Sequence, residues 1–284
     1  EDSSSNSNDG TSSGMTQSAL QQSDLSFKTS YSPFALDFDI DNKISITTSV
    51  STFTAYSVSV WINVDALPSP YGWSRIFEFH NQRYFGLHSD GTLVVGYKNG
   101  SWTENFTTAT LNTSQWYHLS FVDNGTNTVV YINGVGETLN NTSSAINDNW
   151  YIANNATTRL NAKLSNVSVW NTALTASQVT EIYNEGVPSN LNNHSAYSNL
   201  VSWWQLGSNS SFNTNWTVLD EKGSNDGTSV NMSENAIVDG VGSYANGLSS
   251  GMGGDEVIGD APYSTANALS VNMDVLDRTT DVPS

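Results

Sequence analysis

The chain has 284 residues, with 27 acidic and nine basic side chains and a formal net charge of -18. Such a surface repels nucleic acid and anionic lipid, so neither is expected as a partner. No run approaches the ~20 apolar residues that a membrane-spanning helix needs, so we expect no membrane insertion. Cysteine is absent, which excludes disulfides and thiolate metal sites. The low charged fraction of 13% and the 11% of aromatic residues favour an extracellular β protein over a cytosolic enzyme.

Residues 1–30 are rich in Ser, Asn and Gln and hold too few hydrophobic residues for a core of their own. We interpret them as a polar N-terminal segment. Because the first residue is Glu1 rather than methionine, we expect a processed or incomplete product.

From Tyr31 onward the pattern is that of short strands. YSVSVWINV (residues 56–64) alternates apolar and polar side chains, as in a strand with one face in a core. Dipeptides that favour tight hairpin turns separate the later strands, at Asp90-Gly91, Asn99-Gly100, Asn124-Gly125 and Asn133-Gly134. At least eight strands between Phe34 and Trp170 predict an all-β, antiparallel sandwich or barrel.

One short helix is predicted in LTASQVTEIYNEG (residues 174–186). Thr175 is placed as the N-cap, and Gln178 three residues later completes a capping box. Val179 and Ile182 share one face, and Gly186 is placed to end the helix. A helix this short is stable only if that face packs on the sandwich.

Four phrases in chain order resemble laminin-G-like jelly rolls of the concanavalin A type. They are ALDFDIDNKISI, YSVSVWINV, SQWYHLSFVDNGTNTVVYINGV and AKLSNVSVWNTALTASQVTEIYNEG. The resemblance implies an antiparallel jelly-roll β-sandwich with one short helix over residues 31–190. It leaves function open, because this fold serves lectins, adhesion modules, glycan hydrolases and virion proteins alike.

The phrase SNDGTS occurs twice, at residues 7–12 and 224–229, which suggests a chain that begins partway through a repeating unit. Modules of the resembled family often begin with a strand like LVSWW, which here follows the helix. Residues 191–240 are therefore predicted to be the start of a second module, and residues 241–284 a Gly-rich extended tail. Alternatively, the segment fills the missing strand position, in the same chain or in a neighbouring one. The candidate residues for such strand donation are Leu200, Val201, Trp203, Trp204 and Leu206.

Catalytic patterns are missing from the sequence, so we expect no enzyme. A glucan hydrolase of this fold would carry closely spaced carboxylates on one strand, whereas Glu78 stands alone and residues 37–41 offer aspartates without a glutamate partner. The four histidines lack metal-binding spacing, and no Gly-x-Ser-x-Gly elbow occurs.

Exposed aromatic side chains are the candidate glycan contacts. Tyr71 and Trp73 lie in the proline-flanked stretch ALPSPYGWSR, and Trp102 and Trp150 follow polar turns. The alternative is that these four rings only cap the ends of the sandwich.

Calcium is the one cofactor considered. Asp39 and Asp41 lie two residues apart next to Asn42, and hard oxygen ligands of this kind suit the ion. Members of the resembled family often hold a calcium ion in this region. The alternative is a pair of solvated acids at the end of a strand.

Two functions remain open. The Asn- and Thr-rich style and the closing residues resemble structural proteins of marine bacteriophages. We therefore expect a non-enzymatic structural or adhesion protein on a virion surface, such as a decoration, fibre or tail appendage, with copies of itself or other virion proteins as partners. The alternative is a carbohydrate-binding lectin module of a secreted or cell-surface protein, with cell-surface glycans as partners. The expected location is extracellular or on a virion.

Overall fold

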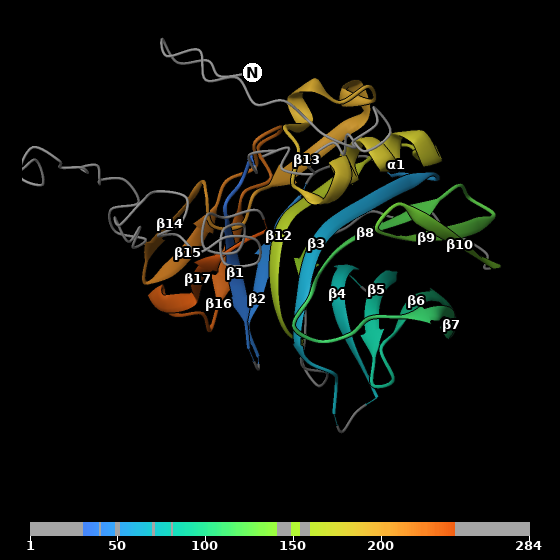
Figure 1. The fold of residues 1–284 in the computed structure, drawn as a ribbon, viewed down its shortest axis with the longest axis horizontal. Helices are drawn as coiled ribbons and strands as arrows, with labels where there is room; N and C mark the ends of the chain where they lie inside the picture. Colours follow the sequence, from blue (N-terminus) through green and yellow to red (C-terminus); the bar gives the residue numbers. More distant parts are fainter. Residues whose placement is uncertain are drawn as a thin grey trace, which may run out of the picture.

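The fold is a sandwich of two antiparallel β-sheets with a short helix on one outer face (Figure 1). This computed structural model describes residues 31–39, 41–48, 52–69, 72–80, 82–140, 149–153 and 160–241. The predicted jelly-roll sandwich is confirmed. The predictions for residues 1–30 and for the tail from 242 onward lie outside the described residues.

The first sheet has the strand order β10-β9-β8-β3-β12-β1-β17, and β13 also pairs with β12. Leu36 of β1 pairs with Leu164, and Trp204 of β13 pairs with Val167, so β1 and β13 lie against successive parts of β12. The strands are β1 (Phe34–Phe38), β3 (Tyr56–Ala66), β8 (Trp116–Asp123), β9 (Asn127–Ile132), β10 (Val135–Asn140), β12 (Asn161–Trp170), β13 (Leu200–Trp204) and β17 (Ile237–Asp239).

The second sheet has nine strands in the order β14-β15-β16-β2-β11-β4-β5-β6-β7. Figure 1 shows β4 to β7 on the side of the sandwich away from α1. The strands are β2 (Lys43–Ile46), β4 (Trp73–Phe79), β5 (Arg83–His88), β6 (Thr92–Asn99), β7 (Ser101–Thr110), β11 (Trp150–Ile152), β14 (Ser210–Asn213), β15 (Asn215–Val218) and β16 (Gly227–Val230).

Strand β3 shows how the layers pack. Its alternate residues Val58, Val60 and Ile62 belong to the main core between the sheets. The opposite face, which includes Ser59 and Trp61, is buried as well. A second, smaller core covers this outer face, because side chains of α1 and the segment after it pack on β12 and β13. The central part of the first sheet is therefore covered on both sides.

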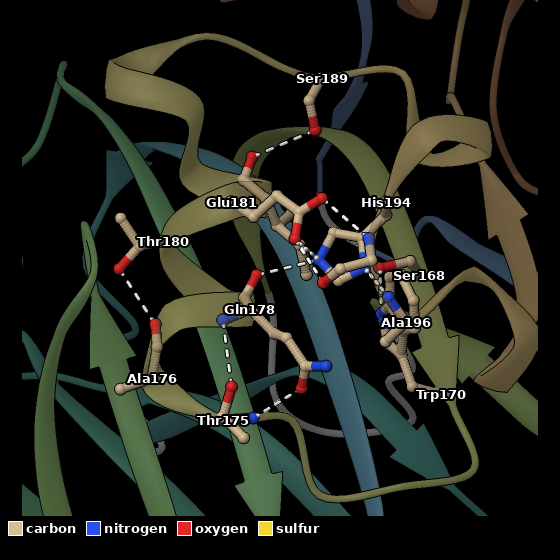
Figure 2. A network of polar contacts seen from close by, with 12 residues as sticks. Ser168, Trp170, Thr175, Ala176, Gln178, Thr180, Glu181, Ser189, His194 and Ala196 are labelled. Atoms are coloured by element: carbon tan, nitrogen blue, oxygen red, sulfur yellow. Dashed lines mark hydrogen bonds and ion pairs between the residues drawn. The ribbon is translucent and has the colours of Figure 1, made fainter.

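Helix α1 (Ala176–Tyr183) begins as predicted. Thr175 is the N-cap, and the reciprocal bonds of the capping box with Gln178 are both present (Figure 2). The helix ends earlier than predicted, because Asn184 adopts the left-handed conformation at the C-cap in place of Gly186. Short 3-10 turns follow at Asn184–Gly186, Leu191–Asn193, Tyr197–Asn199 and Glu234–Ala236. No helix in the described part of the chain is long and apolar enough to cross a membrane.

The four predicted hairpin turns are present, but they differ in conformation. Only at Asn133-Gly134 do both residues have positive φ, as a type I′ turn requires. At the other three sites the glycine alone has positive φ. The turn positions could thus be predicted, whereas the turn types could not.

Residues 200–239 add strands to both sheets of the same sandwich. Strand β13 pairs with β12, and β16 pairs with β2. Of the candidate donated residues, Val201 is half-buried and the others are buried: Leu200, Trp203, Trp204 and Leu206. Three of the new strands, β13, β16 and β17, pair with strands of the earlier part of the chain, and β14 and β15 extend the second sheet beyond β16.

Candidate functional site

The outer face of the second sheet carries an unusual set of side chains. Strand alternation sends Phe77, Phe79, Phe85 and Val95 into the main core. The residues between them on β4 to β7 point away from the first sheet. This outward face is built on four adjacent strands, which hold its side chains more rigidly than a loop would.

Three aromatic rings meet on this face. Trp73 stacks on Tyr84, with 4.9 Å between ring centroids and 16° between ring planes. Trp102, from β7, lies 5.1 Å from Tyr84 at 59°. Tyr84 is fully buried, whereas Trp73 and Trp102 remain partly exposed. The two tryptophans thus present their rings to solvent on a buried tyrosine.

Arg75 joins the three rings. Its guanidinium carbon lies 5.5 Å from the Trp73 centroid, 4.9 Å from that of Tyr84 and 5.4 Å from that of Trp102. The group is also 2.6 Å from the carboxylate of Glu78, which is only 1% exposed. Cation–π contacts and this ion pair hold the arginine in place.

Tyr84 is fixed from two sides. Its hydroxyl donates to Glu104 Oε1 at 2.5 Å. Burial, followed by this hydrogen bond and the charge of Glu104, raises the pKa of Tyr84 well above its usual range, so the hydroxyl stays a donor. The ring lies against Gly96 of β6, where an added Cβ would come within 2.1 Å of it. We call Trp73, Arg75, Glu78, Tyr84, Trp102 and Glu104 the aromatic–arginine cluster.

The sequence-predicted glycan contacts divide into three groups. Trp73 and Trp102 lie together in the cluster, although they are far apart in the chain. Tyr71 lies outside the described residues. For Trp150 the prediction is wrong, because the side chain is fully buried in the main core. Sequence reasoning missed Arg75 and Tyr84, whose only signal is their alternation with core residues on β4 and β5.

The candidate calcium residues form the turn between β1 and β2. The Asn42 side-chain oxygen accepts the Asp39 N–H at 2.8 Å, and its amide nitrogen donates to the Asn231 carbonyl at 2.7 Å. Asn231 in turn donates to the Asp41 carbonyl. No group of three or more His, Asp or Glu side chains suited to a metal ion occurs among the described residues. The calcium site stays a prediction.

A second polar site lies beside α1 and is drawn in Figure 2. It is a pocket of about 240 Å³ lined by Glu181, Asn184, Ser189, Asn190, Asn193 and His194. His194 Nε2 donates to the Gln178 carbonyl at 3.0 Å, and Nδ1 accepts the Ala196 N–H at 3.0 Å. Both oxygens of Glu181 accept hydrogen bonds from Ser195. These bonds fasten the segment after α1 to the helix, so the site is better explained as a structural clamp.

His118 is buried on the outer face of the first sheet, beneath α1. Its Nε2 lies 2.7 Å from Ser59 Oγ, and its ring lies 5.1 Å from Trp61 and 5.9 Å from Tyr183. Burial lowers the pKa of His118 to about 3, so the ring is neutral in the folded protein. This buried histidine packs under α1 through its contact with Tyr183 and is not available to a ligand.

Acid is therefore expected to destabilise the protein through His118. Its pKa returns to about 6.5 on unfolding, so the unfolded state binds more protons between pH 6.5 and 3. Stability should fall as the pH drops through this window. His118→Gln should reduce the slope of unfolding free energy against pH by up to about one proton. Denaturant titrations between pH 7 and 4 measure it, with His88→Gln as the control. Equal slopes in wild type and His118→Gln would contradict the assignment.

Two solved structures are similar to this chain over most of its length. One is a candidate carbohydrate-binding protein from Bacteroides ovatus, with a TM-score of 0.57 and 18% identity over 74% of this chain and 60% of that one. This chain thus spans less than two thirds of that protein. Another is a heptameric SAP-like pentraxin from Limulus polyphemus, with a TM-score of 0.46 and 17% identity over 75% of this chain and 96% of that one. At 18% identity the likeness to the Bacteroides ovatus protein shows the fold alone.

The sequence itself matches one family. No curated protein sequence matches the chain. The family profile described as the concanavalin A-like lectin/glucanases superfamily matches residues 38–180, which is half of the sequence. These residues run from the end of β1 into α1 and include the whole aromatic–arginine cluster. The chain belongs to the concanavalin A-like lectin/glucanase superfamily.

Proposed function

We propose that the chain binds carbohydrate through the aromatic–arginine cluster, as a lectin-like module. The observation that carries the proposal is the packing of three rings around one guanidinium on an outward-facing sheet. Flat aromatic faces suit the apolar faces of sugar rings, and fixed polar groups beside them suit hydroxyls. The half-exposed rings of Trp73 and Trp102 would supply the stacking surface, and the carboxylate of Glu104 would accept from a hydroxyl.

The cluster is preorganised for binding. Arg75 is held by Glu78, and Tyr84 is held by Glu104 and by the close approach of Gly96. Few side chains would have to be ordered when a ligand arrives, which lowers the entropic cost of association. The Arg75–Glu78 pair also neutralises the one guanidinium in the cluster, which favours neutral sugars over anionic ones.

The positions and contacts of the two glutamates in the cluster favour glycan binding without hydrolysis of the glycan. Glu78 on β4 and Glu104 on β7 are separated by β5 and β6. At ~4.8 Å per interstrand step their backbones lie about 14 Å apart. Each carboxylate is also already engaged, one with Arg75 and the other with Tyr84. Incubation with the bound glycan should therefore yield no shorter products.

An adhesive role on an extracellular surface would follow from the same glycan contact. The virion and assembly parts of the sequence interpretation have less support. Strand β13 is paired with β12 of its own chain, and Trp203 and Trp204 are fully buried there. Exchange between chains would require β13 to leave that position and expose both rings, so we favour the lectin-like module.

Alanine substitution of Trp73 or Trp102 is expected to weaken glycan binding by at least about tenfold, equivalent to ~1.4 kcal/mol, because each removes a stacking surface. The measurement is a glycan array followed by titration of the strongest ligand, with calcium and with a chelator. Trp116→Ala is the control, since Trp116 is a partly exposed tryptophan on the first sheet. The control should bind as wild type does, and unchanged binding in both cluster variants would place the site elsewhere.

A further inference from the structure

The cluster is one end of a longer row on the outer face of the second sheet. Tyr151 of β11 pairs with Glu78, Glu78 pairs with Tyr84, Tyr84 with Gly96, and Gly96 with Glu104. Cross-strand partners point to the same face of a sheet. These five residues therefore lie side by side on the outward face and cross five neighbouring strands.

The row is long enough for more than one sugar. From β11 to β7 it takes four interstrand steps, which amount to about 19 Å at ~4.8 Å each. The aromatic–arginine cluster occupies the part over β4 to β7. A single ring stacked on Trp73 or Trp102 would leave the β11 end of the row unused.

A second aromatic site stands at that far end. Tyr151 is half-buried, and its neighbours Trp150 and Ile152 point into the main core. The Lys43 ammonium lies 5.2 Å from the Tyr151 centroid, and the His80 ring lies 5.4 Å from it. The ring is thus flanked by two side chains with hydrogen-bonding groups, and its cross-strand partner is Glu78, the cluster residue that binds Arg75.

From this arrangement we infer that the ligand is an extended oligosaccharide that runs across the strands, with Tyr151 as its distal contact. The inference rests on the proposed function and adds the ligand class. Stacking surfaces at both ends of the row and charged, hydrogen-bonding groups between them suit consecutive sugar rings. Affinity should then grow with chain length until the ligand reaches Tyr151.

The test uses ladders of neutral oligosaccharides, of two to six units, built from glucose, mannose, galactose or xylose. Dissociation constants are measured by calorimetry for wild type, Tyr151→Ser and Tyr151→Phe. We expect wild-type affinity for the best series to rise at least about tenfold between two and four or five units. Tyr151→Ser should abolish most of this rise and leave the affinity for two units unchanged, which also shows that the variant is folded. Tyr151→Phe keeps the ring and should retain the rise.

Each other outcome has a distinct meaning. Affinity that is level from two units upward, in wild type and Tyr151→Ser alike, would overturn the extended row and leave the cluster as a single-sugar site. A rise with length that persists in Tyr151→Ser would place the distal contact elsewhere and overturn the assignment of Tyr151. If Trp73→Ala and Trp102→Ala leave every affinity unchanged, or no ladder binds, the proposed function fails together with the inference.

Discussion

Replacing Trp204 with alanine is expected to lower the free energy of unfolding by about 3–5 kcal/mol. The side chain is fully buried, and its ring forms a T-shaped pair with that of Trp150 of the second sheet, with 6.2 Å between centroids and 87° between ring planes. Its Nε1 also donates to the Asn225 carbonyl at 2.8 Å. The substitution leaves a large cavity between the sheets and an unpaired carbonyl in the loop between β15 and β16.

The number of unfolding transitions shows whether residues 200–239 unfold together with the earlier strands. If residues 200–239 belong to the same packing unit as the earlier strands, Trp204→Ala should shift one cooperative transition. Thermal and denaturant unfolding, followed by tryptophan fluorescence and by circular dichroism, measure this. Trp116→Ala, at a partly exposed position, is the control and should cost much less. A separate transition that alone moves in Trp204→Ala would show that these residues form a second unit.

The sequence-based prediction succeeded where the signal is local. The capping box of Thr175 and Gln178 involves four consecutive residues, and the alternation in β3 needs only nine. It did not place the strands after residue 199. Their partners, β12 and β2, lie tens of residues or more upstream, and no local pattern tells which strand β13 or β16 will join. The similarity of LVSWW to the start of a module predicted the strand that the structure has as β13. That this strand joins the sandwich of its own chain was only one of the alternatives.

The candidate site shows the same limit. Trp73, Trp102 and Trp150 look alike in sequence, because each stands beside a turn or a polar stretch. The pairing of the strands determines that Trp150 points into the core, whereas Trp73 and Trp102 both contact Tyr84 on the outer face. The ring of Tyr84 depends on Gly96 of another strand, so its role is not visible in its own segment. A contact made by three strands is a property of the sheet register, and the sequence alone leaves the register open.

One buried ion pair joins the two sheets. Arg83 of β5 lies 2.6 Å from Asp123 of β8, and both side chains are fully buried. The same Asp123 carboxylate accepts the Thr128 hydroxyl at 3.0 Å and the Gly125 N–H at 2.8 Å. The Arg83 guanidinium carbon also lies near one aromatic ring of each sheet, 6.0 Å from the Tyr56 centroid and 5.8 Å from the Tyr97 centroid.

Breaking this pair from one side should be among the most damaging single changes. Arg83→Met leaves the Asp123 carboxylate buried without its cation, and Asp123→Asn leaves the guanidinium without its anion. Each is expected to cost about 3–5 kcal/mol, because an uncompensated charge stays in the interior. Asp65→Asn is the matched control. It breaks the ion pair with Lys163 on a partly exposed surface, where the expected loss is at most ~1 kcal/mol.

The double variant separates the attraction of the pair from the cost of burying charge. Arg83→Met with Asp123→Asn removes both charges, so it should cost less than the sum of the two single changes. Denaturant unfolding of wild type, both single variants and the double variant closes the cycle. A double variant that loses the full sum would mean that the two groups stabilise the fold independently. In that case Asp123 would act mainly through Thr128 and Gly125, and Arg83 through the rings around it. A strong coupling energy would show that the Arg83–Asp123 ion pair itself stabilises the contact between the two sheets. This contact lies under β5, the strand that also carries Tyr84 on its outer face.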